Sequence, residues 1–205
     1  MSLDAPHHVR GRPWSLPNLL TYGRVLAVPA VVACLYGQII IEAGLWLRWV
    51  AFAIFVVAAI TDYFDGYLAR AWDQHSAIGR MLDPIADKLL VGVVLLMLAA
   101  DETIRGWSLL AACVILAREI LVSGLREFLA ELRVSVPVTQ LAKWKTSLQL
   151  IAVGFLIAGP AGDKLIPYVT MTGVILLWLA ALLTLYTGYD YFRAGVTHLI
   201  DEDEA

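Results

Sequence analysis

The sequence has little charge and almost no cysteine. Asp, Glu, Lys and Arg make up 16% of its 205 residues whereas 60% are hydrophobic, which is not expected of a water-soluble domain of this size. The 2 cysteines exclude a disulfide scaffold, and an aromatic content of 10% argues against a disordered chain. Cys34 and Cys113 lie within apolar runs, where we expect buried, small apolar side chains. The composition favours a membrane protein.

Six apolar stretches are long enough to cross a bilayer, which takes roughly 20 mostly apolar residues. Strand alternation is absent, and open sheet edges cannot be satisfied in lipid. We therefore expect an all-α polytopic membrane protein with six transmembrane helices, joined on one side by turns at Gly44, Gly106 and residues 159–162. The expected spans are residues 16–41, 46–64, 81–100, 106–130, 141–159 and 166–189.

An even number of spans places both termini on one side, and the basic residues decide which side that is. Only Arg48, Arg105 and Lys164 lie away from the termini, whereas the other twelve of the 15 Lys and Arg residues lie on the terminal side. The positive-inside rule therefore predicts cytoplasmic termini. No signal peptide and no nucleic-acid partner are expected. The expected organisation is a polar cytoplasmic segment at 1–14, a membrane domain at 15–195 and an acidic, solvated tail at 196–205.

Four aspartates gather where the second apolar stretch meets the third. We expect two antiparallel helices, joined by residues 71–78, to direct these carboxylates into one space. The alternative is structural, with Asp62 and Asp65 as helix caps and Asp83 in a turn before Pro84. At about 100° per residue, two sets of positions each share one helix face: Asp62, Asp65, Gly66 and Ala69, and then Gly79, Asp83 and Asp87.

Carboxylates at membrane depth are costly, so their clustering indicates a function. Each costs roughly 2.5–3.5 kcal/mol on insertion scales, and four cost on the order of 10 kcal/mol. With no His or Cys at the clustered positions, the ligands are hard oxygens that suit Mg²⁺ or Mn²⁺, and two ions about 4 Å apart polarise a phosphoryl group. Gly66, Ala69 and Gly79 let a ligand approach the backbone, and Arg70 offers a planar donor fork for phosphate.

The spacing of these residues resembles the signature of the CDP-alcohol phosphatidyltransferase family at every position, D-x2-D-G-x2-A-R-x8-G-x3-D-x3-D. The resemblance implies a six-helix membrane enzyme, commonly a homodimer, that transfers a phosphatidyl or related group from a CDP-linked donor to an alcohol and releases CMP. It implies that Asp62, Asp65 and Asp83 bind metal and that Asp87 binds metal or takes the hydroxyl proton as a base. The implied CDP site consists of Asp62, Asp65, Gly66, Ala69, Arg70 and Gly79.

A wider resemblance narrows the acceptor alcohol. Residues 15–24, 117–127 and 143–146 resemble the bacterial phosphatidylglycerophosphate synthase branch of the family, which transfers from CDP-diacylglycerol to glycerol 3-phosphate. The implied site faces the cytoplasm at a bacterial inner membrane. Lys143 and Lys145 lie about 200° apart on a helix, so both cannot face one ligand squarely. A dianionic acceptor needs cations, and the available ones are Arg118, Arg126, Lys143 and Lys145.

Several alternatives stay open. Arg118 can pair with Glu119 or Glu127 instead of a ligand, and Asn18 and Arg24 either reach the nucleotide or anchor the first span at the interface. Within the family, the acceptor could be the phosphatidylglycerol of cardiolipin synthesis or an inositol phosphate. Membrane prenyltransferases also use paired aspartate motifs with Mg²⁺, but without the D-G-x-x-A-R continuation. A transporter with an ion path is the non-enzymatic alternative.

Overall fold

The computed structural model has six helices and no strand among the residues that it describes. It describes the backbone of residues 16–41, 44–72, 77–131 and 140–203. Within these ranges, the side chains left undescribed are those of residues 16–17, 41, 63–72, 77–80, 83–84, 131, 140, 142–143, 190 and 194–203. The helices are α1 (Leu16–Ile41), α2 (Trp46–Trp72), α3 (Ala77–Ala100), α4 (Ser108–Glu131), α5 (Gln140–Asp163) and α6 (Val169–Asp203). The all-α prediction is confirmed for this part of the chain.

The helices follow the six apolar stretches, with differences at their ends. α2 extends to Trp72 and α3 begins at Ala77, so the acidic segment lies on two successive helices, as expected. The turn expected at 159–162 is wrong, because α5 is only kinked there and continues to Asp163. α6 remains helical to Asp203, into the acidic tail. Positive φ angles of 75° at Gly44 and 57° at Gly106 agree with turns at both.

The outer surface of the bundle is apolar, as a lipid environment requires. Three stretches of the described residues are long and apolar enough to cross a membrane: Asn18–Ile40, Ser108–Ala130 and Val169–Arg193. Large side chains such as Leu26, Leu96 and Leu121 are exposed on this surface, and the chain is a membrane protein. Cys113 is also exposed and Cys34 is only partly buried, both as free thiols. The expectation that both are buried is wrong, because an apolar run in such a protein covers the outward face as well as the core.

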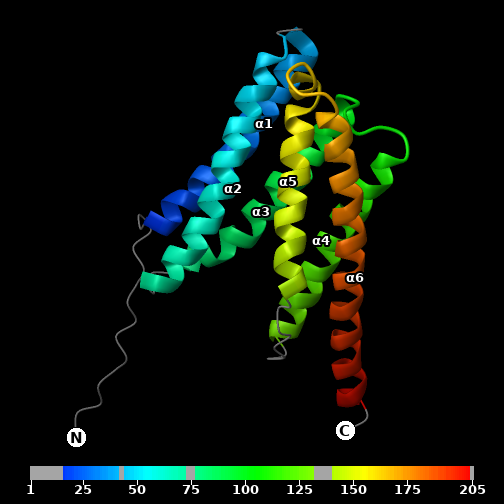
Figure 1. Ribbon diagram of the computed structural model, residues 1–205. Coiled ribbons are helices and arrows are strands. Elements are labelled where there is room, and N and C mark those ends of the chain that lie inside the picture. Colours follow the sequence, from blue (N-terminus) through cyan, green and yellow to red (C-terminus); the bar gives the residue numbers. More distant parts are fainter. Residues whose placement is uncertain (1–15, 42–43, 73–76, 132–139, 204–205) are drawn as a thin grey trace, which may run out of the picture.

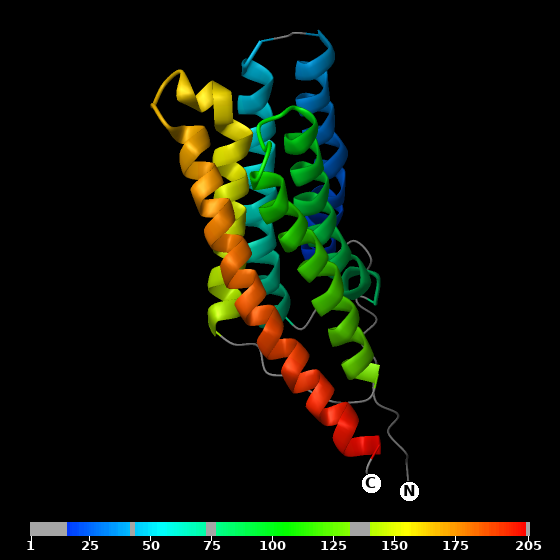
Figure 2. The ribbon, with the colours of Figure 1, turned by 90° about the vertical axis from the view of Figure 1, so that its right-hand side faces the viewer.

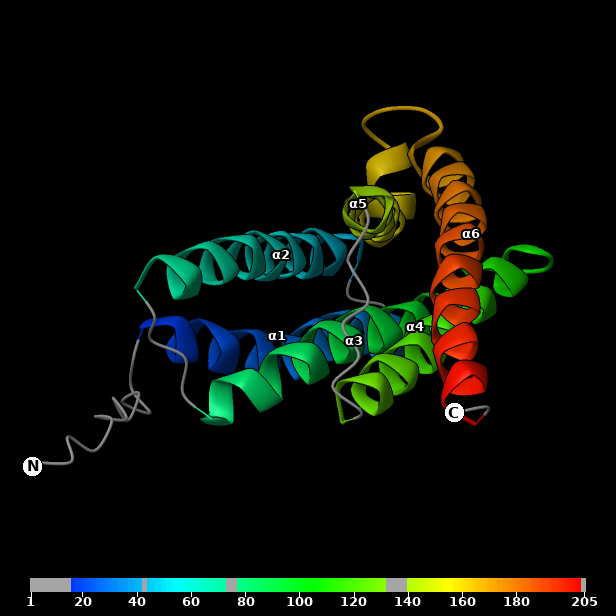
Figure 3. The ribbon, with the colours of Figure 1, turned by 90° about the horizontal axis from the view of Figure 1, so that it is seen from below.

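The helices form two groups of three. α1 packs against α2 and α3, and α6 packs against α4 and α5. Figure 3 shows the two groups side by side. α5 also contacts α2 and α3 and thereby joins the groups. Residues 101–107 and 164–168 lie at the upper end of Figure 1, and the last turns of α2, α4 and α6 lie towards the opposite end, which we call the lower end (Figures 1 and 2).

An apolar core fills the middle and upper part of the bundle, and most of the buried polar side chains lie near the lower end. The core includes Val31, Leu35, Phe55, Leu98 and Leu156. Polar groups inside a membrane protein need partners, so the lower end is where a functional site is expected. The buried polar residues near the starts of α1 and α5 and in the second half of α6 are Asn18, Thr21, Arg24, Lys145, Gln149, Thr184 and Thr187.

A buried arginine supplies hydrogen-bond donors at the break in α5. Gly159 has a non-helical backbone (φ 31°, ψ −119°), and Pro160 lacks the N–H that would donate to the carbonyl of Leu156. Arg48 Nε donates to the carbonyl of Ile157 at 2.9 Å, and Arg48 Nη2 donates to that of Leu156 at 3.4 Å. The side chain from α2 thus donates to the carbonyl that Pro160 leaves without a helical partner and to the carbonyl of the next residue.

The same arginine is paired with an acid from the loop after α3. Arg48 is 2% exposed, and its Nη2 lies 3.0 Å from Oδ2 of Asp101 and 2.6 Å from Oγ1 of Thr103. The charges of Arg48 and Asp101 cancel inside the protein. The contacts of Arg48 join α2, α5 and the α3–α4 loop. In the sequence analysis this arginine served only to predict the membrane orientation, whereas the structure shows that it also holds helices together.

Replacing Arg48 by Met should destabilise the protein strongly. The change leaves Asp101 without its counter-charge and two carbonyls without donors, which costs about 3–5 kcal/mol for a buried pair. Thermal unfolding in detergent measures the loss, with Arg105→Met at an exposed position of the same end as the matched control. A melting temperature equal to that of the control would contradict the assigned role.

At the same end, Asp163 caps the first turn of α6. The backbone N–H of Thr170 donates to Oδ1 of Asp163 at 3.0 Å, and the Thr170 hydroxyl donates to Oδ2 at 2.5 Å. These hydrogen bonds hold the pKa of Asp163 below its usual range. The carboxylate therefore fixes the connection between α5 and α6 in its ionised form.

Candidate active site

Two of the signature aspartates meet at one arginine. Arg24 Nη1 on α1 lies 2.8 Å from Oδ1 of Asp62 on α2 and 2.5 Å from Oδ1 of Asp87 on α3. The arginine side chain is 1% exposed, whereas the two aspartates are 35% and 47% exposed. The two carboxylates are therefore accessible from outside, whereas the arginine that pairs with them is buried behind them.

The position of α1 explains this contact. Because α1 packs against both α2 and α3, a long side chain on it can reach the two helices at once. Asn18 and Thr21 are buried on the same stretch of α1. The sequence interpretation left open whether Arg24 reaches a nucleotide or anchors the span, and it missed the pairing with the aspartates. The signal was present, since an arginine within an apolar helix needs a counter-charge.

The other signature positions have a helical backbone, but their side chains lie outside the described residues. The gathering of four carboxylates therefore stays a prediction at Asp65 and Asp83. Among the side chains that are described, no group of three His, Cys, Asp or Glu residues comes together. The undescribed positions are Asp65, Gly66, Ala69 and Arg70 on α2 and Gly79 and Asp83 on α3.

An apolar groove leads along α1 and α2 to this arginine. It encloses about 500 Å³, and Leu20, Ala27 and Ile54 are among its lining residues, with Arg24 and Thr61 as polar members. The Thr61 hydroxyl donates to carbonyls of its own helix at 2.9 Å and is thus satisfied. Apart from Arg24 and Thr61, the lining of the groove is apolar.

A second charged cluster lies among α4, α5 and α6. Lys145 on α5 is 3% exposed and hydrogen-bonds Glu119 on α4. Arg118 Nη1 lies 3.7 Å from the same carboxylate, and Arg118 Nη2 donates to Oγ1 of Thr187 on α6 at 3.2 Å. The alternative in which Arg118 pairs with Glu119 is therefore observed, although Lys145 is the closer partner of that acid.

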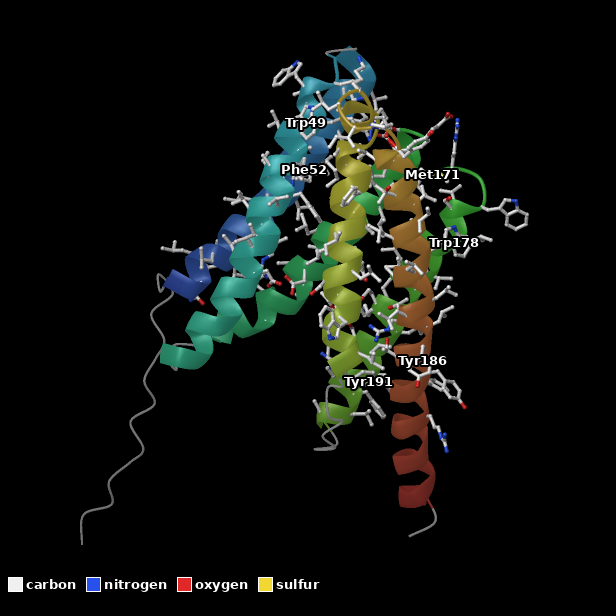
Figure 4. All side chains as sticks on the ribbon, in the orientation of Figure 1. Trp49, Phe52, Met171, Trp178, Tyr186 and Tyr191 are labelled. Atoms are coloured by element: carbon white, nitrogen blue, oxygen red, sulfur yellow. The ribbon has the colours of Figure 1, made fainter. Side chains whose placement is uncertain are left out.

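Arg126 approaches the same cluster from the outside. Its guanidinium lies 5.4 Å from the centre of the Tyr191 ring, and Nη2 donates to the Tyr191 hydroxyl at 3.4 Å. Tyr191 points into the bundle near the lower end, whereas Tyr186 points outward (Figure 4). The side chain of Lys143 lies outside the described part. The three cations Arg118, Arg126 and Lys145, less the one carboxylate of Glu119, leave a net charge of +2.

The α6 side of this cluster was missed from the sequence. A methyl group at Gly188 would lie 3.1 Å from Cγ of Arg118, so the glycine provides the space in which that side chain lies. α6 reads as a plain apolar helix, but one signal was available. Four polar or small residues follow the i, i+3, i+4, i+7 spacing of one helix face: Thr184, Thr187, Gly188 and Tyr191.

The profile of one protein family, described as CDP-alcohol phosphatidyltransferase, matches residues 14–186. The chain belongs to the CDP-alcohol phosphatidyltransferase family. The resemblance drawn from the aspartate signature is therefore confirmed. The matched range reaches from just before α1 into α6, so the charged residues of both clusters lie within the family domain, whereas Thr187, Gly188 and Tyr191 on α6 lie beyond it.

Bacterial relatives in this family carry the name CDP-diacylglycerol–glycerol-3-phosphate 3-phosphatidyltransferase. One from Rickettsia bellii is 48% identical over 180 residues, which is 88% of this chain and 94% of the relative. Relatives from Cereibacter sphaeroides and Escherichia coli strain K12 are 40% and 38% identical, each covering 92% of this chain and 99% of the relative. The similarity thus extends over nearly the whole of both chains.

Replacing Arg24 by Met leaves Asp62 and Asp87 facing each other without a counter-charge. Since solvent screens these half-exposed carboxylates, we expect the free energy of unfolding to fall by about 1–3 kcal/mol. In Arg24→Met combined with Asp87→Asn, one carboxylate is neutral, so the loss should be smaller than the sum for the single variants. Denaturation in detergent measures the cycle, and strictly additive losses would contradict the ion pair.

Proposed function

We propose that the protein transfers the phosphatidyl group of CDP-diacylglycerol to a hydroxyl of glycerol 3-phosphate, giving phosphatidylglycerophosphate and CMP. The observation that carries this proposal is the pair of oppositely charged clusters towards the lower end of a family domain. The names of relatives that are 38–48% identical over most of both chains support the same reaction. A donor diphosphate and a phosphate-bearing acceptor need such clusters, one to hold cations and one to hold an anion.

The aspartate cluster suits divalent cations. Asp62 and Asp87 carry two negative charges against the one positive charge of Arg24, which leaves a net −1 among these three side chains. Their donors are hard carboxylate oxygens, and Asp65 and Asp83 lie on the same two helices. We place Mg²⁺ or Mn²⁺, as two ions, at these four aspartates. Bound there, the ions supply polarisation of the phosphoryl group and screening of the CMP leaving group.

The remaining signature residues are assigned to the donor nucleotide. Gly66, Ala69 and Gly79 offer close approach to the backbone, and Arg70 offers a fork of N–H donors to the diphosphate. Asn18 and Arg24 bound this region from α1, where both are buried. The apolar groove that ends at Arg24 is suited to an acyl chain of the donor, because its lining is apolar up to the arginine.

We assign the proton transfer to Asp87. An acceptor hydroxyl oxygen attacks the phosphorus that bears the diacylglycerol, the bond from this phosphorus to the oxygen of CMP breaks, and the hydroxyl proton passes to the carboxylate. Arg24 holds Oδ1 of Asp87 at 2.5 Å, and Asp87 is the more exposed of the two described aspartates. Arg24 thus orients the base from the protein side and leaves it accessible to the substrate.

The second cluster is suited to the acceptor phosphate. Arg118, Arg126 and Lys145 with Glu119 carry a net charge of +2, which matches a phosphomonoester dianion. Lys143 on the same helix stays a predicted member. Phosphatidylglycerol, the acceptor of cardiolipin synthesis, has no phosphomonoester and makes less use of this charge. An inositol phosphate would use it, and the names of the relatives favour glycerol 3-phosphate over it.

We further propose that all six helices span a bacterial inner membrane, with both termini and the site on the cytoplasmic side. Both charged clusters lie towards the lower end, and Arg48, Arg105 and Lys164 lie towards the upper end, which supports this orientation. The organisation into segments 1–14, 15–195 and 196–205 and the assembly as a homodimer stay predictions.

Release of CMP by the purified protein tests the reaction. We expect turnover that requires CDP-diacylglycerol, glycerol 3-phosphate and Mg²⁺ or Mn²⁺ together, and that chelation or Asp62→Asn abolishes. Glu102→Gln, which neutralises an exposed acid at the upper end, is the matched control and should retain activity. Turnover with inositol phosphate or phosphatidylglycerol in place of glycerol 3-phosphate would refute the acceptor, and metal-independent turnover would refute the ions.

Gly188→Ala should weaken acceptor binding selectively. The added methyl group would lie 3.1 Å from Cγ and 3.4 Å from Nε of Arg118 and would displace that side chain. We expect KM for glycerol 3-phosphate to rise about fivefold, equivalent to about 1 kcal/mol, with KM for CDP-diacylglycerol unchanged. Gly124→Ala on α4, where an added methyl group meets no atom within 4 Å, is the matched control. Equal increases in both KM values would point to a folding defect instead.

A further inference from the structure

Three buried polar atoms on α4, α5 and α6, the helices that carry the second charged cluster, have no hydrogen-bond partner among the described residues. They are Nε of Arg118 on α4, Oε1 of Gln149 on α5 and Oγ1 of Thr184 on α6. Each buried, unsatisfied group costs about 1–3 kcal/mol. The hydroxyl of Thr187 hydrogen-bonds the carbonyls of Leu183 and Thr184 within its own helix. The hydroxyl of Thr184 makes no such hydrogen bond.

The packing of α5 and α6 locates two of these atoms. A methyl group at Gly173 would lie 2.9 Å from the Leu156 side chain, so these residues are level where the antiparallel helices meet. Counting from this contact towards the lower end places Thr184 level with Lys145. Gln149 follows Lys145 by one helical turn, on the same face and closer to the core.

The expected directions of the two side chains favour their approach. Side chains on a helix lean towards its N-terminus. The N-terminus of α5 is at the lower end, so Gln149 leans back towards Lys145, whereas α6 starts at the upper end, so Thr184 leans away from the lower end. Both are at most 3% exposed. From the helix register and these directions, we expect the two polar groups to lie on the inner side of the cation cluster.

A hydrogen-bond-accepting amide oxygen and a hydrogen-bond-donating hydroxyl are the two partners that a single alcohol group needs. An alcohol donates one hydrogen bond, which the amide oxygen of Gln149 can accept, and it accepts hydrogen bonds, which the hydroxyl of Thr184 can donate. We propose that Gln149 and Thr184 bind the middle hydroxyl of the glycerol phosphate acceptor, the one that is not consumed in the transfer. This assignment rests on the proposed function. The phosphate then lies against Arg118 and Lys145, and the glycerol carbons extend inward from it.

The consequence is a selectivity that charge alone does not provide. The cation cluster binds any small phosphomonoester, whereas a buried amide and hydroxyl remain unsatisfied when the acceptor has no middle hydroxyl. Sites built to hydrogen-bond a substrate hydroxyl reject analogues that lack it. Gln149 and Thr184 are therefore specificity-determining residues for the polyol, distinct from the groups that hold its phosphate.

The test compares glycerol 3-phosphate with 3-hydroxypropyl phosphate, which keeps the phosphate and the terminal hydroxyl but lacks the middle one. The ratio of the two kcat/KM values is measured by CMP release for the wild type, Gln149→Leu and Thr184→Val. We expect the wild type to prefer glycerol 3-phosphate and each substitution to lower that preference about tenfold, through loss of turnover with glycerol 3-phosphate alone. Gln38→Leu is the control, because Oε1 of Gln38 on α1 is equally buried without a partner and lies towards the opposite end.

The outcomes separate this inference from the proposed function. An unchanged ratio in both variants, or an equal loss with both acceptors, would overturn the assignment and leave water or packing as the role of these groups. Absence of CMP release from the wild type with glycerol 3-phosphate would instead refute the proposed function. Thr184→Val preserves the shape of the side chain, so it keeps the test open if Gln149→Leu does not fold.

Discussion

Charge inside an apolar helical bundle must be compensated, and this requirement organises the whole molecule. Each of three basic residues, Arg24, Arg48 and Lys145, is at most 3% exposed. Each forms an ion pair with an acidic residue on another element. Arg24 joins α1 to α2 and α3, Lys145 joins α5 to α4, and Arg48 joins α2 to the loop after α3. In a lipid environment, where apolar burial distinguishes poorly between helix neighbours, such pairs specify which helices meet.

Ion pairs whose charges cancel differ in role from clusters that keep a net charge. Arg48 and Asp101 cancel each other, and the remaining donors of the arginine are used on carbonyls at the kink of α5. Arg24 only partly neutralises Asp62 and Asp87, and Glu119 only partly neutralises the cations around it. A residual charge in a partly enclosed place stabilises the apo protein less than a closed pair does. Under the proposed function, a charged ligand completes the balance at each cluster.

Much of the fold could be predicted from the sequence, because apolar runs of bilayer length leave few options other than helices. The two helices that carry the signature aspartates were predicted for the same reason. The arginine that holds two of those aspartates could not be paired from periodicity, since Arg24 and Asp87 are 63 positions apart. The α5 break resembled a turn because Gly-Pro punctuation does not say whether the chain reverses or only bends. The polar face of α6 was missed because most of the surrounding residues are apolar, although its i, i+3, i+4, i+7 spacing can be read from the sequence.

The partial compensation in the two clusters has an electrostatic consequence beyond either one. The described side chains Arg24, Asp62 and Asp87 carry a net charge of −1, whereas Arg118, Arg126, Lys145 and Glu119 carry a net charge of +2. The two clusters therefore contribute local electric fields of opposite sign at the lower end of the bundle. Under the proposed function, these fields favour the approach of divalent cations to the first cluster and of phosphomonoesters to the second. Ionic strength weakens this sorting over distances beyond the Debye length, about 8 Å at physiological salt. Under the proposed function, the approach of a metal ion and of a phosphate therefore depends on long-range attraction as well as on fit.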